Sequence, residues 1–404
     1  MKKFILSVAA IMSAAISVSA FVPRKANFPD IPGYVVMKGD FHTHSAFSDG
    51  RSWPTTRVYE AIYDDLDILA VTDHLEPRLK KFIDEGLFRA ENITLSTSYE
   101  LAKKAAQAEN LPLMVLHGGE LTRGSNLFAG HFNLHFIKDA EAISNAEQNA
   151  PKSKDKVKSE EDAILAGLRE ARKQGCFITL NHPDWDAQAR NETKWWPFYD
   201  RLLKEGLLDG IEIVNSTVSP FLDKDAFEWA VEKNLTIVSG TDCHSPMNKI
   251  FDYASGEMRS MTLVFAKERT EESVKEALQK GRTAVFNDGR LYGKQEFLEP
   301  VLRSILDVKV VSKSSDHRMT VRLTNSGALP VILYKAPGSN NIRIMRFVKV
   351  NPGEILDLSV IGEYDEDGVK TVRPIKDLKL DFYVQNFLSA PGKPIRVSFT
   401  PAGL

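Results

Sequence analysis

Two histidines stand one residue apart in the stretch GDFHTHSAFSDG, residues 39–50, which follows an apolar run and continues to Asp49. In an extended strand, residues i and i+2 point to the same side, so His42 and His44 would converge on one point. A pair of this kind on a strand is a common way to hold a metal ion, but the pair alone is a weak signal. On this stretch alone, two surface histidines or two core histidines with ordinary hydrogen-bond partners are an equal alternative.

Further ligand-type residues stand where other apolar runs end. His74 closes AVTDH, His182 lies in TLNHP and His244 closes GTDCH. Carboxylates join them at Asp49, Glu120 and Asp242. In a barrel of βα units, the C-terminal ends of the strands gather at one face, where active sites form. So many imidazoles and carboxylates on successive strand ends predict a metal site that holds more than one ion.

The elements that must position these residues follow a βα rhythm between residue 38 and about residue 289. The apolar runs are DILAVTDH, LPLMVLHGGEL, HFNLHFI, CFITLNHP, GIEIVNS, TIVSGTDCH and MTLVFA. Helices are expected between them at residues 55–63, 98–109, 160–174, 196–205, 223–233 and 270–280. The polar segment 140–159 interrupts the rhythm and is expected to be a surface excursion. The pattern predicts a parallel sheet with helices around it.

The pattern changes after Pro300. Six runs from MTVRLTN to IRVSFT alternate apolar and polar residues between Gly, Pro and Asn turns. This is typical of antiparallel strands, and the simplest arrangement is a small all-β sandwich of immunoglobulin-like type. The histidine of this part, His317, lies in a polar turn and is expected to be solvated. No cluster of catalytic residues is evident there.

Five of the motifs, HTHSAFSDG, VTDH, GGE, NHP and TDCH, resemble in order the motifs of the PHP (polymerase and histidinol phosphatase) superfamily. The resemblance covers residues 38–293. It implies a distorted seven-stranded βα barrel that binds two or three divalent metal ions, and many members hydrolyse phosphomonoesters or phosphodiesters. The expected domains are therefore a signal peptide at residues 1–20, the barrel at 38–293 and the β-sandwich at 300–404.

The resemblance also implies a ligand set. The first metal would take His42, His44, Glu120 and Asp242. The second would share Glu120 as a bridge and add His182 and a histidine from GHFNLHFI, for which His131 is preferred because it follows the glycine. The third would take Asp49, His74 and His244.

Other candidate ligands have simpler interpretations. His135 points the same way as His131 but lies about 13 Å further along a strand, too far to share one ligand position. It is expected to be packed or to support the ligands, as is His117, which precedes the GGE turn. Cys243 stands where the family usually has a small residue such as alanine, and it is expected to be a buried thiol rather than a soft ligand.

The chemistry expected of such a site is phosphoester hydrolysis. Three divalent ions give +6 and Asp49, Glu120 and Asp242 give −3, which leaves +3 with neutral imidazoles. This field suits a phosphate and its transition state. A water ionised by two metals could attack phosphorus, with Glu120, Asp242 and His244 as the residues expected to carry catalysis. Nitrogen and oxygen ligands fit Zn, Mn or Fe.

Two other functions remain open. An amidohydrolase also begins with H-x-H on a strand, but that class usually needs a carbamylated lysine at the end of a mid-barrel strand, and here those strands offer Glu120, His131 and His182. A non-catalytic, metal-dependent binding protein for a glycan or a phosphorylated ligand is the second alternative. The near-complete ligand set argues against it.

The substrate is expected to be a small phosphorylated molecule such as a sugar phosphate or a nucleotide. The loops that would select it are residues 51–53, 184–196 and 216–222. Trp195 and Trp196 could stack on a sugar or a base, or could only pack on the barrel. The net charge of −2 and the mixed charges argue against a stable nucleic-acid partner or a membrane-surface role.

The N-terminus has the pattern of a secretory signal peptide. Lys2 and Lys3 precede an apolar run that ends in small residues, with cleavage expected after Ala20. The run is short for a transmembrane anchor. A lipoprotein is not expected either, because no cysteine lies near the cleavage site. We therefore expect an exported protein, periplasmic or secreted, with no membrane span after cleavage. Cys176 and Cys243 are expected at opposite ends of their strands and thus without a disulfide.

Overall fold

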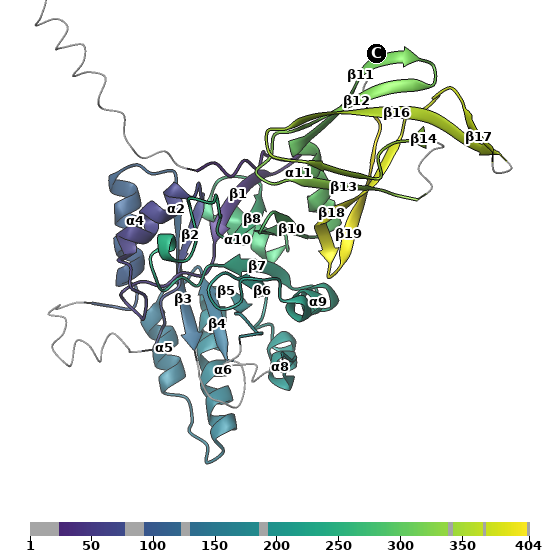
Figure 1. Cartoon of the computed structure of the whole chain (residues 1–404). Coiled ribbons are helices and arrows are strands. Elements are labelled where there is room, and N and C mark those ends of the chain that lie inside the picture. The colour runs from purple at the N-terminus through teal and green to yellow at the C-terminus, as the bar shows by residue number, and fades with distance from the viewer. Residues whose placement is uncertain are drawn as a thin grey trace, which may run out of the picture.

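The protein is described by a computed structural model that covers residues 24–76, 93–122, 130–185, 193–337, 342–366 and 369–401. The expected signal peptide, residues 1–20, lies outside these residues. Figure 1 shows a mixed α/β fold, with helices around a large sheet and a separate smaller sheet near the C-terminus. No helix of the described residues has the length and apolar character needed to cross a membrane.

The first part of the chain carries ten strands of the described structure. They are β1 (Val35–Asp40), β2 (Ile68–Val71), β3 (Met114–Thr122), β4 (His131–His135), β5 (Phe177–Leu180), β6 (Gly210–Asn215), β7 (Thr236–Gly240), β8 (Met261–Ala266), β9 (Thr283–Asn287) and β10 (Arg290–Gly293). Each of the apolar runs expected there forms a strand. Strands β8 and β1 to β7 follow one another in the large sheet.

The large sheet curls back on itself. The backbone N–H of Ser239 in β7 donates to Thr262 Oγ1 in β8 at 2.8 Å, and Thr283 Oγ1 in β9 donates to the carbonyl of Ile237 in β7 at 2.7 Å. These bonds bring the last strand of the path beside β8 and β9. This curled sheet is the framework that the expected barrel requires. The number of strands in the barrel, expected to be seven, stays a prediction.

The sheet is not parallel throughout, which corrects the sequence-based expectation. Strands β1, β2 and β3 are mutually parallel, as are β5, β6 and β7, but β4 runs antiparallel to both β3 and β5. Strand β8 is antiparallel to β1 and β9. The antiparallel direction of β4 follows from the short connection that precedes it. Only residues 123–130 separate β3 from β4, too few for the helical crossover that a parallel pair requires.

Every helix expected from the sequence is present, with bounds that differ by a few residues at most. They are α2 (Pro54–Tyr63), α4 (Thr97–Ala108), α6 (Lys156–Gln174), α8 (Pro197–Lys204), α9 (Lys224–Lys233) and α10 (Glu271–Gln279). A short 3₁₀ turn, η1 (Met247–Lys249), follows β7. Local signals account for the bounds of α6, because Asp155 accepts hydrogen bonds from Val157 and Lys158 and Gly175 ends the helix with a φ of 83°.

The expected surface excursion at residues 140–159 is wrong in its first half. Helix α5 (Ala140–Gln148) lies there and buries Ile143 in the core. The side chain of Asp139 caps it by accepting from the N–H of Ala142 at 2.9 Å, and Ser144 Oγ donates to the carbonyl of Leu75 at 2.7 Å. One capped turn and a narrow apolar face are sufficient because the helix packs against α6.

The change of pattern expected at Pro300 falls inside a helix. Helix α11 (Gln295–Ile305) contains Pro300, and the antiparallel strands begin only at Leu306. The helix tolerates the proline because it buries an apolar face. That face consists of Phe297, Leu298, Val301, Leu302 and Ile305.

The remaining strands belong to two sheets. They are β11 (Leu306–Ser315), β12 (Arg318–Asn325), β13 (Val331–Lys335), β14 (Ile342–Arg343), β15 (Phe347–Val350), β16 (Ile355–Glu366), β17 (Val369–Val372), β18 (Leu380–Ala390) and β19 (Lys393–Phe399). Strands β11, β12, β16, β14 and β17 form the smaller sheet, and β15, β13, β18 and β19 continue the large one. The join is a parallel pairing of β10 with β18, in which Leu291 faces Phe387.

Candidate metal centre

The predicted site residues come together at one edge of the curled sheet. His42 and His44 follow β1, His74 follows β2, and Glu120 lies in the second half of β3. His182 follows β5, and Asp242 and His244 follow β7. His182 and Asp242 have φ values of 25° and 51°, which non-glycine residues rarely adopt. Backbone of this kind concentrates at functional sites, where the surroundings hold it in place.

The reversed direction of β4 explains how His131 joins them. The first residue of an antiparallel strand lies at the edge where its parallel neighbours end. His131 therefore pairs with Thr122 at the end of β3, and its Nδ1 lies 3.1 Å from Glu120 Oε1. His135, at the other end of β4, pairs with Gly118 and lies deeper in the sheet.

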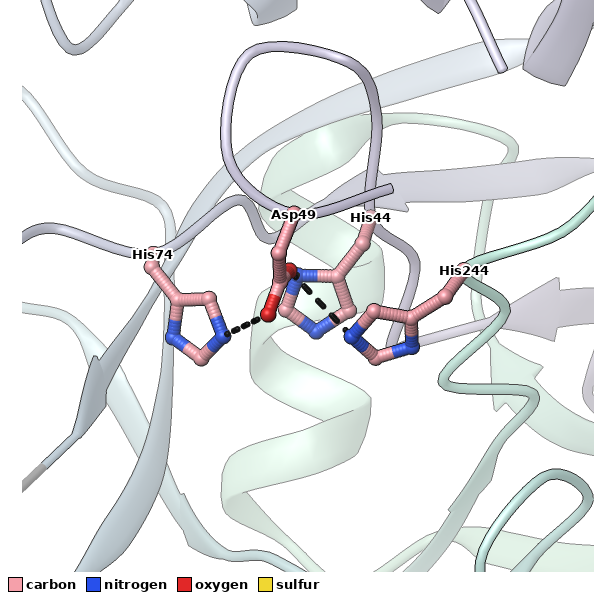
Figure 2. A group of neighbouring side chains, drawn as sticks. All are labelled: His44, Asp49, His74 and His244. Atoms are coloured by element: carbon pink, nitrogen blue, oxygen red, sulfur yellow. Dashed lines mark ion pairs between the residues drawn. The ribbon is translucent and has the colours of Figure 1, made fainter. Parts of the chain in front are cut away.

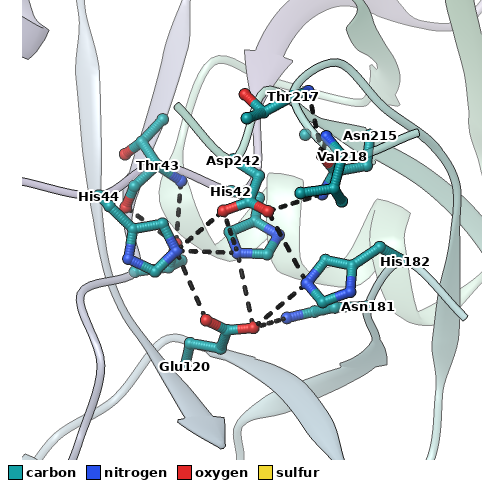
Figure 3. Close-up of polar contacts among 12 residues, drawn as sticks. His42, Thr43, His44, Glu120, Asn181, His182, Asn215, Thr217, Val218 and Asp242 are labelled. Atoms are coloured by element: carbon teal, nitrogen blue, oxygen red, sulfur yellow. Dashed lines mark hydrogen bonds and ion pairs between the residues drawn. The ribbon is translucent and has the colours of Figure 1, made fainter. Parts of the chain in front are cut away.

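The first group of ligand-type atoms surrounds His42 Nε2 (Figure 3). It lies 3.1 Å from His44 Nε2 and 3.4 Å from Asp242 Oδ1. His44 Nε2 lies 3.1 Å from the same Asp242 oxygen and 3.4 Å from Glu120 Oε2. Ligands about 2.1 Å from a tetrahedral metal ion stand about 3.4 Å from one another. The spacing of these buried atoms therefore fits a divalent metal.

The second group shares Glu120 with the first. Its Oε1 faces His131 at 3.1 Å and His182 Nε2 at 3.6 Å, and His182 Nε2 also lies 3.8 Å from Asp242 Oδ2. Asn181 Nδ2 donates to Glu120 Oε1 at 2.9 Å and fixes its orientation. One carboxylate thus faces the atoms of both groups, as a bridging ligand would.

The third group is drawn in Figure 2. Asp49 Oδ2 lies 3.3 Å from His74 Nε2, and Asp49 Oδ1 lies 3.2 Å from His244 Nε2 and 3.5 Å from His44 Nδ1. The side chains of Asp49 and His244 are about a third exposed, at 34% and 33%, whereas those of the first two groups are buried. The third group therefore lies at the mouth of the site.

Burial and the carboxylates act against each other on the histidines. Burial opposes the charged form of His42, but Asp242, Glu212 and Glu120 outweigh it and raise the pKa of His42 well above its usual range. Burial likewise opposes the charged form of His74, yet Glu120 and Asp49 raise its pKa to about 9. Burial would raise the pKa of Asp242, but His42 and His44 hold it well below its usual range. The carboxylate of Asp242 is therefore ionised, as a metal ligand must be, and the site favours positive charge, either on the histidines or on a bound ion.

The candidates that the sequence set aside lie elsewhere. His135 is fully buried, with its ring 5.5 Å from that of Phe41, and burial lowers its pKa to about 3. His117 stacks on Tyr99 at 4.3 Å. Cys243 and Cys176 are free and buried, and burial raises the pKa of the Cys243 thiol to about 11. A protonated thiol is a poor metal ligand.

The loops proposed to select a substrate are partly described. Residues 186–192 lie outside the described residues. Trp185 makes edge contacts with the rings of His131 and His182, both at 5.4 Å. Trp195 packs on Tyr199 at 5.2 Å and donates to Asp200 at 2.7 Å. Trp185 therefore lies against two candidate ligands, whereas Trp195 packs beside α8.

One residue in the site escaped the sequence analysis. Glu212 of β6 is buried, and its Oε1 lies 2.8 Å from His42 Nδ1. Asn215, at the end of the same strand, donates to Asp242 Oδ2 at 3.2 Å. The available signal was a glutamate and an asparagine inside the otherwise apolar run GIEIVN, which reads as an ordinary strand.

Comparison with solved structures places this chain in a family. A two-domain protein from Bacteroides vulgatus, described as containing a predicted PHP-like metal-dependent phosphoesterase, is 32% identical over 95% of this chain and 100% of its own, with a TM-score of 0.79. This chain belongs to the PHP-like metal-dependent phosphoesterase family. The PHP-like protein thus matches its relative across both parts of the chain.

Two weaker structural matches are a protein from Bifidobacterium adolescentis proposed to be a metal-dependent phosphoesterase, and an amidohydrolase from Chromobacterium violaceum with bound sulfate and no metal. The first is 17% identical over 51% of this chain and 87% of its own, with a TM-score of 0.37. The second is 16% identical over 52% and 88%, with a TM-score of 0.34. Searches of protein-family models and of curated proteins found no match.

Proposed function

We propose that this PHP-like protein is an exported, metal-dependent phosphoesterase that hydrolyses a small phosphomonoester or phosphodiester with two or three divalent ions. The observation that carries the proposal is the position of Glu120. Ring nitrogens of five histidines lie within 3.7 Å of its carboxylate: His42, His44, His74, His131 and His182. A buried carboxylate surrounded in this way is suited to bridge metal ions rather than to form one salt bridge.

The residues that would hold the ions are those of the three groups, with Zn, Mn or Fe as the metals that suit nitrogen and oxygen ligands. Bound divalent ions would lower the pKa of a water molecule and offset the negative charge of the phosphate. Glu120 and Asp242 fix the directions of the imidazoles around them. His244, which is partly exposed beside Asp49, lies where a phosphate would enter.

The charge of the site agrees with an anionic substrate. Asp49, Glu120, Asp242 and Glu212 together contribute −4, so three divalent ions at +6 would leave +2 with neutral imidazoles. This net charge is one unit lower than the +3 expected from the sequence, because Glu212 is now counted. The remaining positive charge would stabilise the phosphoryl oxygens in the transition state.

The substrate and the location are parts of the same proposal. A sugar phosphate or a nucleotide fits the aromatic side chains near the site, of which Trp185 lies against two of the proposed ligands. The sequence of residues 1–20 supports export to the periplasm or beyond. N-terminal sequencing of the mature protein tests this part, because export predicts a chain that begins near Phe21.

The two alternatives make different predictions. An amidohydrolase would cleave amides faster than phosphoesters, yet strands β3, β4 and β5 bring Glu120, His131 and His182 to the site and no lysine. A binding protein would take up metal and ligand without turnover. Purified protein loaded in turn with Zn, Mn and Fe should be tested against phosphomonoesters, phosphodiesters, short oligonucleotides and amides. Hydrolysis of a phosphoester supports the proposal, and turnover of amides alone or of nothing contradicts it.

A further inference from the structure

Glu212 is a buried carboxylate for which the proposed ligand set has no role. It lies in the middle of β6, where all six residues are buried, and its exposed fraction is 2%. A buried carboxylate is costly unless it is well paired. Its partners therefore indicate why the chain keeps it there.

The first partner is the ring of His42. Its Nε2 faces the proposed ligand atoms, 3.1 Å from His44 Nε2, while its Nδ1 lies 2.8 Å from Glu212 Oε1. A neutral imidazole carries one proton on one of its two nitrogens. A carboxylate beside Nδ1 retains the proton there, and this leaves the lone pair of Nε2 directed at the metal position.

The second oxygen of Glu212 contacts the rest of the site. Glu212 Oε2 accepts from the backbone N–H of His182 at 3.0 Å, at the residue whose φ is 25°. It also accepts from Asn215 Nδ2 at 3.2 Å, and the same amide donates to Asp242 Oδ2 at 3.2 Å. Glu212 is thus connected to His42, His182 and Asp242 together.

The backbone around this contact is shaped to admit it. A Cβ atom added at Gly240 in β7 would lie 2.1 Å from the Cβ of His42 and 2.7 Å from Glu212 Oε1. No side chain fits at that distance. The glycine therefore allows β7, His42 and Glu212 to approach one another.

We propose that Glu212 is a positioning residue for the first and second metal ions. It holds His42 and His182 in the required orientation and keeps His42 in the required tautomer. The inference rests on the proposed metal centre. Glu212 also lies close enough to His42 and His182 to share an ion with them, but its Oε1 is directed at His42 Nδ1 and its Oε2 accepts from two N–H donors, so we assign it to positioning and not to metal binding. Loss of such a carboxylate partner weakens metal binding about 10- to 100-fold in comparable sites.

The test compares Glu212→Gln with a matched variant, Asp223→Asn. The first substitution keeps the size of the side chain but replaces the carboxylate by a neutral amide. Either the NH₂ group or the oxygen of that amide then faces the N–H donors of His182 and Asn215. Asp223 is also buried, but its side chain caps α9 by accepting from Ala226 at 3.0 Å. Zinc affinity is measured by competition with a chromophoric chelator, and folding is followed by circular dichroism.

We expect Glu212→Gln to bind the ions of the first two groups about 10- to 100-fold more weakly. The ion of the third group, held by Asp49, His74 and His244, should be retained. Asp223→Asn should bind all of them as the wild type does. Equal affinity of Glu212→Gln and wild type overturns the inference, whereas a wild-type chain that binds no metal contradicts the proposed function instead.

A measurement on the wild type covers the case in which Glu212→Gln does not fold. In protein loaded with ¹¹³Cd, coupling between the metal and the ring nitrogens of His42 identifies the ligand atom. The inference predicts coupling to Nε2 and a proton retained on Nδ1. Coupling to Nδ1 would make Glu212 a ligand in its own right and would overturn the inference.

Discussion

Glu120 in β3 and His131 at the start of β4 meet across two antiparallel strands, with Oε1 and Nδ1 3.1 Å apart, although the residue that pairs with His131 is Thr122. This contact exists because β4 runs against β3, which places the first residue of β4 at the edge where the sheet carries its ligands. His135, four residues later, lies below that edge. The direction of one strand thus decides which histidine of GHFNLHFI faces the candidate metal centre.

The first prediction separates these two histidines. His131→Ala should lose about one equivalent of metal, because it removes a nitrogen that faces Glu120. His135→Ala should retain the wild-type metal content and cost only stability through the cavity it leaves. Elemental analysis of both variants checks this. The assignment of His131 is wrong if the metal is lost from the His135 variant alone.

The second prediction concerns acid stability. Burial lowers the pKa of His135 to about 3, below the value of 6.5 that applies in the unfolded chain. The unfolded state therefore binds the proton more readily, and folding loses stability as the pH falls from 6.5 toward 3, by up to about 1.4 kcal/mol per pH unit. His135→Leu should remove this part of the loss. Urea unfolding of metal-free protein at pH 7 and pH 5 measures it, with His317→Gln as an exposed control that should change nothing.

The third prediction concerns metal binding at the mouth of the site. The pKa of His74 is raised to about 9, so at pH 7 a metal ion must displace a proton from it. The apparent affinity of the third group should therefore increase up to tenfold per pH unit between pH 7 and pH 9. In the metal-free protein, the contribution of His74 to folding stability changes with pH in the opposite direction. Its raised pKa stabilises the folded state below pH 6.5, and this contribution is lost as the pH rises through 9. Metal titrations and thermal unfolding across this pH range check both. An affinity that does not change with pH would contradict the assignment.

The fourth prediction concerns the join between the two parts of the chain. Phe387 is fully buried and faces Leu291 across the pairing of β18 with β10. Phe387→Ala should lower the free energy of unfolding by about 3–5 kcal/mol. The metal content should not change, because the ligands lie on other strands. Chemical unfolding and elemental analysis measure the two effects, and loss of metal would show that the C-terminal strands also shape the site.

The convergence of the histidines and carboxylates at the strand ends was predictable from the sequence, because strand and helix periodicity is local and these residues end the apolar runs. The helices were found for the same reason, except α5 and α11. In α11, Pro300 suggested a boundary, but the apolar face around Val301 holds the helix together through packing that no local pattern reveals. The strand direction of β4 also depends on its partners and was not foreseen.

Glu212 was missed for a different reason. In the run GIEIVN a glutamate is expected on the solvent side of a strand, and only the fold buries it against a histidine 170 residues away. Contacts of this range depend on the register of several strands. The candidate ligands stand in recognisable motifs that follow one another along the sequence. The residues that support them do not form such motifs.

The most direct test of the account combines metal content and turnover in the wild type and in Asp242→Asn. This variant keeps the shape of the side chain and removes one negative charge between His42 and His44. We predict two to three equivalents of transition metal in the wild-type chain purified without chelator. Phosphoester turnover should be lost on chelation and restored by Zn or Mn.

In Asp242→Asn, turnover should fall by orders of magnitude while the fold survives. A wild-type chain that holds no metal and cannot rebind it, or an Asp242→Asn variant with near-normal turnover, would contradict the metal-dependent mechanism.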